Sequence, residues 1–316
     1  MSNRGYTEKT DLTGQVAIVT GGGRGIGRSI ARALAGAGAQ VAVIARTTKE
    51  IAETAMLIEE AGGRSLPLMV DVTDAAGIEK MVTEVTNSLG PIDLLVNNAA
   101  VTGPLGMTWE MTDTAWWRCM DINVRGAMLC SSAVLPGMIA RQSGRIVAVA
   151  SNAGIGTMAG ASAYSVSKCA LICLCENLAV EAAPHGIPVF SIDPGIVRTA
   201  MSESALASET LGEQFGQYFA ERLDVSPELA AGLVLQLASG RFDRLSGCYL
   251  SVTDDPDDLE TRAETIVQND LHRLRLRTLI SRESRGGPAQ GWVERWEGAG
   301  RPGDGGRPGG DGEGVR

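Results

Sequence analysis

Short apolar runs alternate with longer helical patterns through the first 250 residues. Runs rich in β-branched and other apolar residues, typical of buried strands, lie at 15–20, 41–45, 65–70, 92–97, 145–151, 187–192 and 248–252. Stretches with helical character lie between them, at 25–37, 48–62, 74–89, 112–141, 163–183 and 226–239. Strands that are apolar on both faces and alternate with helices predict a parallel sheet covered on both sides. Right-handed crossovers then predict a doubly wound α/β domain of about seven strands, with its ligand at their carboxyl ends.

The C-terminal part of the chain has a different character. We expect a single domain over residues 12–253, after an N-terminal tail at 1–11, and an appended segment at 254–285 that opens with a short acidic run. Between 254 and 282 an amphipathic helix is predicted by apolar residues at helical spacing: Leu259, Ala263, Ile266, Val267, Leu271 and Leu274. From 286 to 316, 12 of 31 residues are Gly and 3 are Pro, which predicts a disordered tail with Trp292 and Trp296 as its candidate docking residues.

The residue counts exclude several classes of function. Two His residues in 316 exclude a His-rich metal site and disfavour a Ser-His-Asp triad. A net charge of −9 argues against nucleic acid or an anionic membrane as a partner. The six Cys residues include no C-x-x-C pair, so we expect reduced thiols and no metal site. Neither an N-terminal apolar segment nor an apolar run of about eighteen residues is visible, which predicts a cytoplasmic protein without a membrane span.

A glycine-rich loop follows the first expected strand and opens the first expected helix. Gly21, Gly25 and Gly27 follow a G-x-x-x-G-x-G spacing, with Gly23 and Ile26 between them. Glycines permit a tight turn and let the backbone approach a pyrophosphate held on the amides of the helix N-terminus. Because a strand precedes the loop and a helix and a second strand follow it, the pattern predicts dinucleotide binding rather than a merely tight turn.

The end of the second expected strand indicates which dinucleotide is bound. An acidic residue there would accept a hydrogen bond from the adenosine ribose and repel a 2′-phosphate. The sequence instead has Ala45 followed by Arg46, and Arg24 lies in the glycine loop. Two guanidinium groups near the ribose would pair with a phosphate, although either could be an ordinary surface charge. We therefore expect NADP(H) as the preferred cofactor, with NAD(H) as an alternative.

A second motif combines a tyrosine, a lysine and a serine. Tyr164 and Lys168 stand at i and i+4 on an expected helix, a coincidence rarely expected by chance because the chain has four Tyr and four Lys. A neighbouring ammonium group favours the phenolate and so lowers the pKa of a tyrosine, which suits acid–base work. Ser151 ends the preceding strand, where its hydroxyl could hydrogen-bond a carbonyl oxygen as negative charge develops.

In these motifs the sequence resembles the short-chain dehydrogenase/reductase family, over about residues 12–252, and the resemblance implies a Rossmann-like fold. The loop TGGGRGIG matches the family's cofactor loop, and Ser151, Tyr164 and Lys168 match catalytic positions. Further matches complete the implied catalytic and cofactor sets: Asp71 and Val72 at the adenine, Asn97, Asn98 and Ala99 in the sheet-and-cofactor motif, the catalytic Asn123, and Pro194, Gly195, Val197 and Thr199 in the nicotinamide loop.

The resemblance implies hydride transfer between NAD(P)H and a carbonyl/alcohol pair. Tyr164 would donate or accept the proton, and Lys168 would bind the nicotinamide ribose and lower the pKa of the tyrosine. Ser151 would orient the carbonyl group, and Asn123 would hold a water molecule of a proton relay. Ala100 departs from the family, because Gly is usual there, and the ending after residue 246 departs from the common V-D-G-G. A homo-oligomer is implied, a tetramer or, given the altered ending, a dimer.

The resemblance also places a mobile substrate lid at residues 196–224. Apolar residues expected to line a substrate pocket there are Met201, Leu206, Leu211, Phe215 and Tyr218. Segments 101–111 and 154–158 would supply the other walls. Such a pocket suits a hydrophobic or cyclic ketone, so we expect a small-molecule substrate.

Two alternatives remain open from the sequence. A reductase of 3-oxoacyl groups on an acyl carrier protein would need a basic patch beside the pocket, for which Arg118, Arg125 and Arg141 are candidates. A non-catalytic protein that senses NADP would be free to lose the reactive side chains. All four positions of the catalytic set are occupied, which favours an enzyme.

Overall fold

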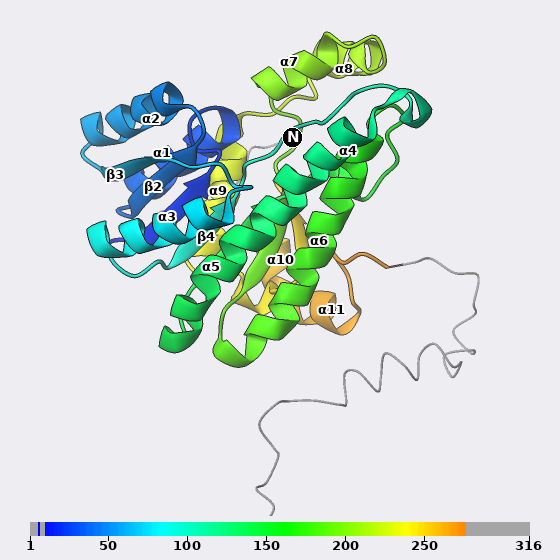
Figure 1. Cartoon of the computed structure of the whole chain (residues 1–316). Helices are drawn as coiled ribbons and strands as arrows, with labels where there is room; N and C mark the ends of the chain where they lie inside the picture. Colours follow the sequence, from blue (N-terminus) through cyan, green and yellow to red (C-terminus); the bar gives the residue numbers. More distant parts are fainter. Residues whose placement is uncertain (1–5, 7–9, 276–316) are drawn as a thin grey trace, which may run out of the picture. The chain divides into compact units, whose positions relative to one another are not determined.

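The computed structural model describes Tyr6 and residues 10–275, and its central feature is a seven-stranded parallel sheet (Figure 1). The strand order is β3-β2-β1-β4-β5-β6-β7. The strands are β1 (Val16–Thr20), β2 (Gln40–Ala45), β3 (Arg64–Met69), β4 (Leu94–Asn97), β5 (Arg145–Val149), β6 (Val189–Asp193) and β7 (Tyr249–Ser251). The order reverses at β1 and β4, so the crevice between these strands lies at a topological switch point. The doubly wound α/β fold and all seven expected strands are confirmed.

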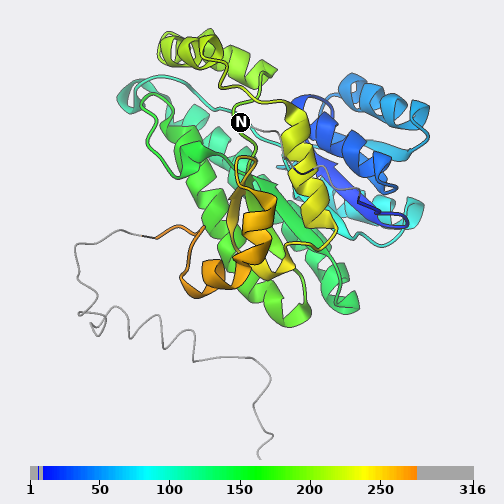
Figure 2. The ribbon, with the colours of Figure 1, turned by 180° about the vertical axis from the view of Figure 1, so that it is seen from behind.

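Helices cover both faces of the sheet because successive strand residues point to opposite sides. In β1, Ala17 and Val19 join one apolar core while Val16 and Ile18 join the other. The first core is covered by α1 (Gly25–Gly36), α2 (Thr48–Glu60) and α9 (Pro227–Ala238). The second is covered by α3 (Ala75–Ser88), α5 (Gly126–Arg141) and α6 (Ser162–Ala182). Figures 1 and 2 show these two layers from opposite sides.

Strand β3 departs from the expected burial on both faces. Leu66 and Leu68 are only half-buried, and 66% of Met69 is exposed to solvent. The strand lies at the edge of the sheet and pairs with β2 alone, from Arg64 opposite Gln40 to Met69 opposite Ala45. Pro67 is accommodated because an edge strand need not donate a hydrogen bond at every residue. The apolar run predicted a strand correctly but its burial wrongly.

The helix expected at 112–141 is interrupted near its middle. Helix α4 (Asp113–Met120) passes through a π-helical turn at Asp121–Arg125 into α5. The whole 29-residue stretch has a mean hydropathy of 1.3 over its most apolar window, enough in length and composition to cross a membrane. The expectation that no segment has this character was therefore wrong. Buried Cys130, Val134 and Met138 pack into the core of the domain, as in a core helix.

Two short helices replace the single C-terminal helix predicted at 254–282. They are α10 (Pro256–Thr261) and α11 (Ala263–Gln268), and Asp255 caps the first by accepting hydrogen bonds from the amides of Asp257 and Asp258. The acidic run thus starts a helix, where carboxylates are favourable. Residues 276–282 and the tail at 286–316, with Trp292 and Trp296, lie outside the described residues.

Only part of the apolar pattern in this segment contacts the domain core. Leu259, Ala263 and Ile266 are buried in the core that α9 also covers, whereas Val267 and Leu271 are 40% and 47% exposed. The predicted apolar stripe is therefore buried along only part of its length. The described part of the extension is nevertheless packed onto the domain.

This packing predicts a difference between two identical substitutions. Leu259→Ala removes a side chain that is 3% exposed and should lower the free energy of unfolding by about 2–5 kcal/mol. Leu271→Ala is the matched control, because its side chain is 47% exposed, and should change the free energy by less than about 0.5 kcal/mol. Urea unfolding followed by circular dichroism measures both. Equal effects would show that the extension does not pack as described.

Candidate active site

Two adjoining cavities open at the carboxyl ends of the central strands. The first, about 470 Å³, lies around the glycine loop, and the second, about 410 Å³, lies beside Ser151 and Tyr164. Ile26, Thr199 and Met201 line both cavities, so a ligand in one can reach the other. This is the sheet edge at which the sequence predicted a ligand.

The structure gathers the expected nucleotide-binding residues in these cavities. The first is lined by Gly21, Gly23, Arg24, Gly25, Ile26, Gly27, Arg46, Asp71, Val72, Asn98, Ala99 and Thr199. The second is lined by Tyr164, Pro194, Gly195, Val197 and again Thr199. Ala100, which replaces the family's usual Gly, also lines the first cavity. Lys168 is buried beneath this surface and lines neither cavity.

Asn98 holds the glycine loop against the end of β4. Its side-chain amide donates to the carbonyl oxygens of Thr20 at 2.9 Å and Gly21 at 3.2 Å. Gly21 has φ +63°, and a Cβ on Gly27 would lie 2.2 Å from the Gly21 carbonyl oxygen. Only glycine fits at position 27 without moving the loop. The loop and the N-terminus of α1 therefore form a narrow backbone cradle that fits a dinucleotide pyrophosphate.

Carboxylates accompany the two arginines at the expected adenosine end. Arg24 lies 3.5 Å from Glu50, and Arg46 lies 3.8 Å from Asp71, whose other cationic neighbour is Arg118 at 3.5 Å. The guanidinium groups are mostly exposed, so these ion pairs are weak and an incoming phosphate can compete for them. Burial opposes ionisation of Asp71, but hydrogen bonds from Thr73 and the nearby arginines hold its pKa below the usual value.

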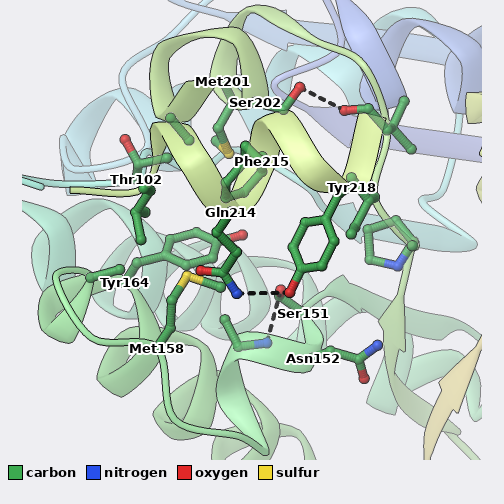
Figure 3. Close-up of a pocket in the computed structure, with 18 of the residues that line it drawn as sticks. Thr102, Ser151, Asn152, Met158, Tyr164, Met201, Ser202, Gln214, Phe215 and Tyr218 are labelled. Atoms are coloured by element: carbon green, nitrogen blue, oxygen red, sulfur yellow. Dashed lines mark hydrogen bonds between the residues drawn. The ribbon is translucent and has the colours of Figure 1, made fainter. Parts of the chain in front are cut away.

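Tyr164 and Ser151 lie close together in the lining of the second cavity (Figure 3). Burial raises the pKa of Tyr164 to about 12, although a hydrogen bond with Ser151 opposes this change. The sequence predicted a lowered pKa, and this was wrong for the structure as it stands because burial outweighs the groups that favour the phenolate. Tyr164 is therefore a neutral phenol at physiological pH and can donate a proton.

Lys168 lies one helical turn after Tyr164 and is almost fully buried. Its ammonium nitrogen donates to the Val149 carbonyl oxygen at 2.7 Å and lies 5.6 Å from the centroid of the Tyr164 ring. Burial lowers the pKa of Lys168 from its ordinary 10.5 to about 8. The group is thus mostly charged at neutral pH, at an energetic cost.

The side chain of Asn123 connects three segments of the chain through hydrogen bonds. Its carboxamide accepts from the Val101 amide at 2.8 Å, and its Nδ2 lies within hydrogen-bond distance of the Val101 carbonyl oxygen at 2.9 Å and the Ser167 hydroxyl at 2.9 Å. The π-helical turn places Asn123 there, and 1% of the residue is exposed. The side chain faces neither cavity, so the implied role in holding a water molecule stays a prediction. Ser167 in turn donates to the Tyr164 carbonyl oxygen at 2.7 Å.

The sequence analysis did not identify two residues that lie near Ser151. Asp193, at the end of β6, accepts hydrogen bonds from the Asn152 amide at 3.2 Å and its side chain at 2.8 Å. Tyr249 donates to the Asn152 carboxamide oxygen at 2.9 Å. This network fixes the backbone immediately after Ser151. A signal existed, since Asp193 follows an apolar run at the carboxyl end of a parallel strand, where ligands bind.

The lid segment folds as α7 (Ala200–Leu206) and α8 (Gly212–Ala220), seen at the top of Figure 1, and both helices contribute residues to the second cavity. Met201, Leu211, Phe215 and Tyr218 line the second cavity as expected, but Leu206 does not. The other walls come from Thr102 and Leu105 and from residues 156–158, with Gly154 buried behind them.

Arg198 was also missed, and it joins the lid to the first cavity. Its guanidinium carbon lies 4.0 Å from the centroid of the Phe219 ring in α8, and the residue also lines the first cavity. A cation stacked on an aromatic face is a favourable contact.

Comparisons with known proteins identify the family. A profile described as short chain dehydrogenase matches residues 15–210. Galactitol 2-dehydrogenase of Rhizobium johnstonii is 37% identical over 260 residues, which cover 78% of this chain and 96% of the relative. The chain belongs to the short-chain dehydrogenase/reductase family. It is an oxidoreductase of the kind that acts on CH–OH and C=O groups.

Solved structures agree with this assignment. A xylitol dehydrogenase solved with NAD⁺ has a TM-score of 0.71 and 28% identity, and covers 76% of this chain and 98% of its own. An actinorhodin polyketide ketoreductase solved with NADPH also has a TM-score of 0.71, with 32% identity, and covers 75% of this chain and 95% of its own. The family binds NAD(P), and these two relatives differ in which form they hold.

The buried ammonium predicts that Lys168→Met stabilises the fold while it removes function. The pKa of Lys168 is about 8 in the folded chain against an ordinary 10.5, a difference worth roughly 3 kcal/mol. Losing the hydrogen bond to Val149 subtracts about 1 kcal/mol, so we expect a gain of about 2 kcal/mol in the free energy of unfolding at pH 7.

The gain should depend on pH in a defined direction. The unfolded chain holds the Lys168 proton up to about pH 10.5, whereas the folded chain releases it near pH 8. The difference between Lys168→Met and wild type is therefore full below pH 8 and shrinks between pH 8 and 10.5. Urea unfolding at pH 7 and pH 10 tests this. A destabilised variant, or a difference that does not change with pH, would show that Lys168 carries no buried charge.

Proposed function

We propose that this protein is an NADPH-dependent oxidoreductase that interconverts a ketone and a secondary alcohol. The observation that carries the proposal is the meeting of the two cavities, one lined by the glycine loop and the other by Ser151 and Tyr164. A nicotinamide ring held near Thr199 would lie between them, because Thr199 lines both. The nicotinamide, when bound, supplies the hydride for reduction and takes it up in oxidation.

The chain's own residues handle the proton and the developing charge. Ser151 donates a hydrogen bond to the substrate carbonyl oxygen and so polarises it. Tyr164 gives its phenolic proton to that oxygen as the carbonyl carbon receives the hydride, which yields the alcohol and a phenolate. The Lys168 ammonium stabilises the phenolate until a proton from solvent restores the phenol. In the oxidative direction the same phenolate removes the alcohol proton.

The preference for NADPH rests on the charges at the adenosine end. The first cavity there has two cationic side chains, Arg24 and Arg46, and Arg46 directly follows β2. A 2′-phosphate would compete with Glu50 and Asp71 for these exposed guanidinium groups. The adjacent carboxylates can also accept a ribose hydroxyl, so NAD(H) remains usable and the preference is one of degree.

Neither alternative gains support from the structure. The arginines expected to receive an acyl carrier protein are each paired with a carboxylate: Arg118 and Arg125 with Asp121, and Arg141 with Asp93. They form no free basic patch beside the second cavity. A non-catalytic sensor would have no need for the arrangement of Tyr164, Lys168 and Ser151.

We also propose that the protein is a cytoplasmic homo-oligomer. The six cysteines are free thiols in the described part of the chain, as expected in a reducing compartment. Trp117 and Met128 belong to an exposed apolar surface on α4 and α5, with 58% and 39% exposure. A second copy of the chain would remove this surface from water.

The proton-donor role predicts that Tyr164→Phe abolishes turnover but leaves nucleotide binding intact. We expect kcat to fall by about 10²- to 10⁴-fold, because only the hydroxyl is lost. Loss of NADPH absorbance at 340 nm, over a panel of aliphatic, cyclic and aromatic ketones, measures turnover, and quenching of protein fluorescence measures binding. Wild-type inactivity on every ketone with both nucleotides would refute the proposal. Substantial activity in Tyr164→Phe would refute the proton-donor role alone.

The role of Arg46 predicts a selective effect on one nucleotide. Arg46→Ala should raise the KM for NADPH by about tenfold and leave the KM for NADH nearly unchanged. A tenfold change is the low end of the range for a hydrogen bond to a charged group, as expected at an exposed site. Arg32→Ala is the control, because Arg32 is exposed on α1 and lines neither cavity. Equal changes in both KM values would contradict recognition of the 2′-phosphate by Arg46.

A further inference from the structure

One face of the lid helix α8 supplies both apolar and polar groups to the second cavity. Leu211, just before the helix, and Gln214, Phe215 and Tyr218 within it are spaced at i, i+3, i+4 and i+7, and all four line the cavity. This spacing gives one helical face. Figure 3 shows Gln214, Phe215 and Tyr218 extending from the lid toward the wall that carries Ser151.

Gln214 and Tyr218 form a hydrogen-bonded pair on this face. The Gln214 side-chain nitrogen donates to the Tyr218 hydroxyl oxygen at 2.7 Å (Figure 3). The tyrosine therefore accepts in this contact and keeps its own proton to donate, while the Gln214 carbonyl oxygen keeps its capacity to accept. The Phe215 ring, edge-on to Tyr218 with centroids 5.9 Å apart, helps to fix the position of the phenol.

Several other polar groups of the cavity are hydrogen-bonded within the protein. The Ser202 hydroxyl donates to the Val197 carbonyl oxygen at 2.9 Å. Asn152 and Asp193 bind each other. The remaining lid surface is apolar, with Met201, Leu211 and Phe215 on it. A donor and an acceptor thus stand side by side on a wall that is otherwise apolar.

We infer that the Gln214–Tyr218 pair recognises a hydroxyl group on the substrate, other than the oxygen of the carbonyl that reacts. A hydroxyl is the small group that uses both functions, since it can accept from Tyr218 and donate to Gln214. The substrate class is then a hydroxyketone, or the corresponding diol, with an apolar skeleton between its two oxygens. This inference rests on the proposed function, which places the reacting carbonyl at Ser151 and Tyr164.

The test compares two ketones of similar size with and without the second hydroxyl. Reduction of 4-hydroxycyclohexanone and 4-methylcyclohexanone, and of the two corresponding 3-substituted ketones, is followed with NADPH. The quantity measured is the ratio of kcat/KM for the hydroxy ketone to that for the methyl ketone. This ratio cancels any general effect of a variant on lid movement or on the chemical step.

The wild-type ratio should exceed one for at least one ring position and fall by about three- to tenfold in Tyr218→Phe and in Gln214→Leu, as expected for one neutral hydrogen bond. Gln217→Leu is the matched control. Gln217 is exposed on the same helix, donates to Glu221 at 2.8 Å and does not line the cavity. Its ratio should equal that of the wild type.

A wild-type ratio at or below one for both ring positions, or ratios unchanged in Tyr218→Phe and Gln214→Leu, overturns the inference and leaves the reductase proposal standing. Absence of turnover on all ketones refutes the reductase proposal instead. In that case calorimetric binding of cyclohexane-1,4-diol and 4-methylcyclohexanol to the full chain still decides the inference. Tighter binding of the diol that is lost in Tyr218→Phe supports it, and equal binding overturns it.

Discussion

The reactive centre depends on one costly constraint, a lysine ammonium group buried inside the domain. Lys168 is 2% exposed, and its charge is held by the Val149 carbonyl oxygen at the end of β5. An unpaired ammonium would lose its proton in such a place, and the pKa of Lys168 is indeed lowered to about 8. The site therefore keeps a cation beside Tyr164 that remains charged at neutral pH, at the expense of stability.

The fold makes this arrangement possible because it fixes separate segments relative to one another. Helix α6 presents Tyr164 and Lys168 one turn apart, and the end of β5 supplies both the acceptor for Lys168 and the serine that lies close to the tyrosine. Asn123 ties α6 to the segment after β4, while Asn98 ties the glycine loop to the same strand. The nucleotide cavity and the reactive pair are thus connected through β4, which lies at the centre of the sheet.

Much of this could be predicted from the sequence. The seven strands, their helices and the loop at Gly21–Gly27 follow local patterns, and Tyr164, Lys168 and Ser151 are linked by short spacings within one segment. The predictions that were wrong concern features that depend on tertiary contacts. The exposure of β3 follows from its place at the sheet edge, and the raised pKa of Tyr164 follows from its burial among residues of other segments. Gln214, Arg198 and Asn152 carry no motif, and only packing shows that they border the cavities.

The central claim is that a hydride moves directly from the nucleotide to a carbonyl carbon held at Ser151 and Tyr164. It is tested most directly by reduction of cyclohexanone with NADPH labelled with deuterium at one or the other C4 position, followed by mass spectrometry of the alcohol. The account predicts one deuterium per alcohol molecule, at the carbinol carbon, from one of the two labelled forms only. Unlabelled alcohol from both forms would contradict it.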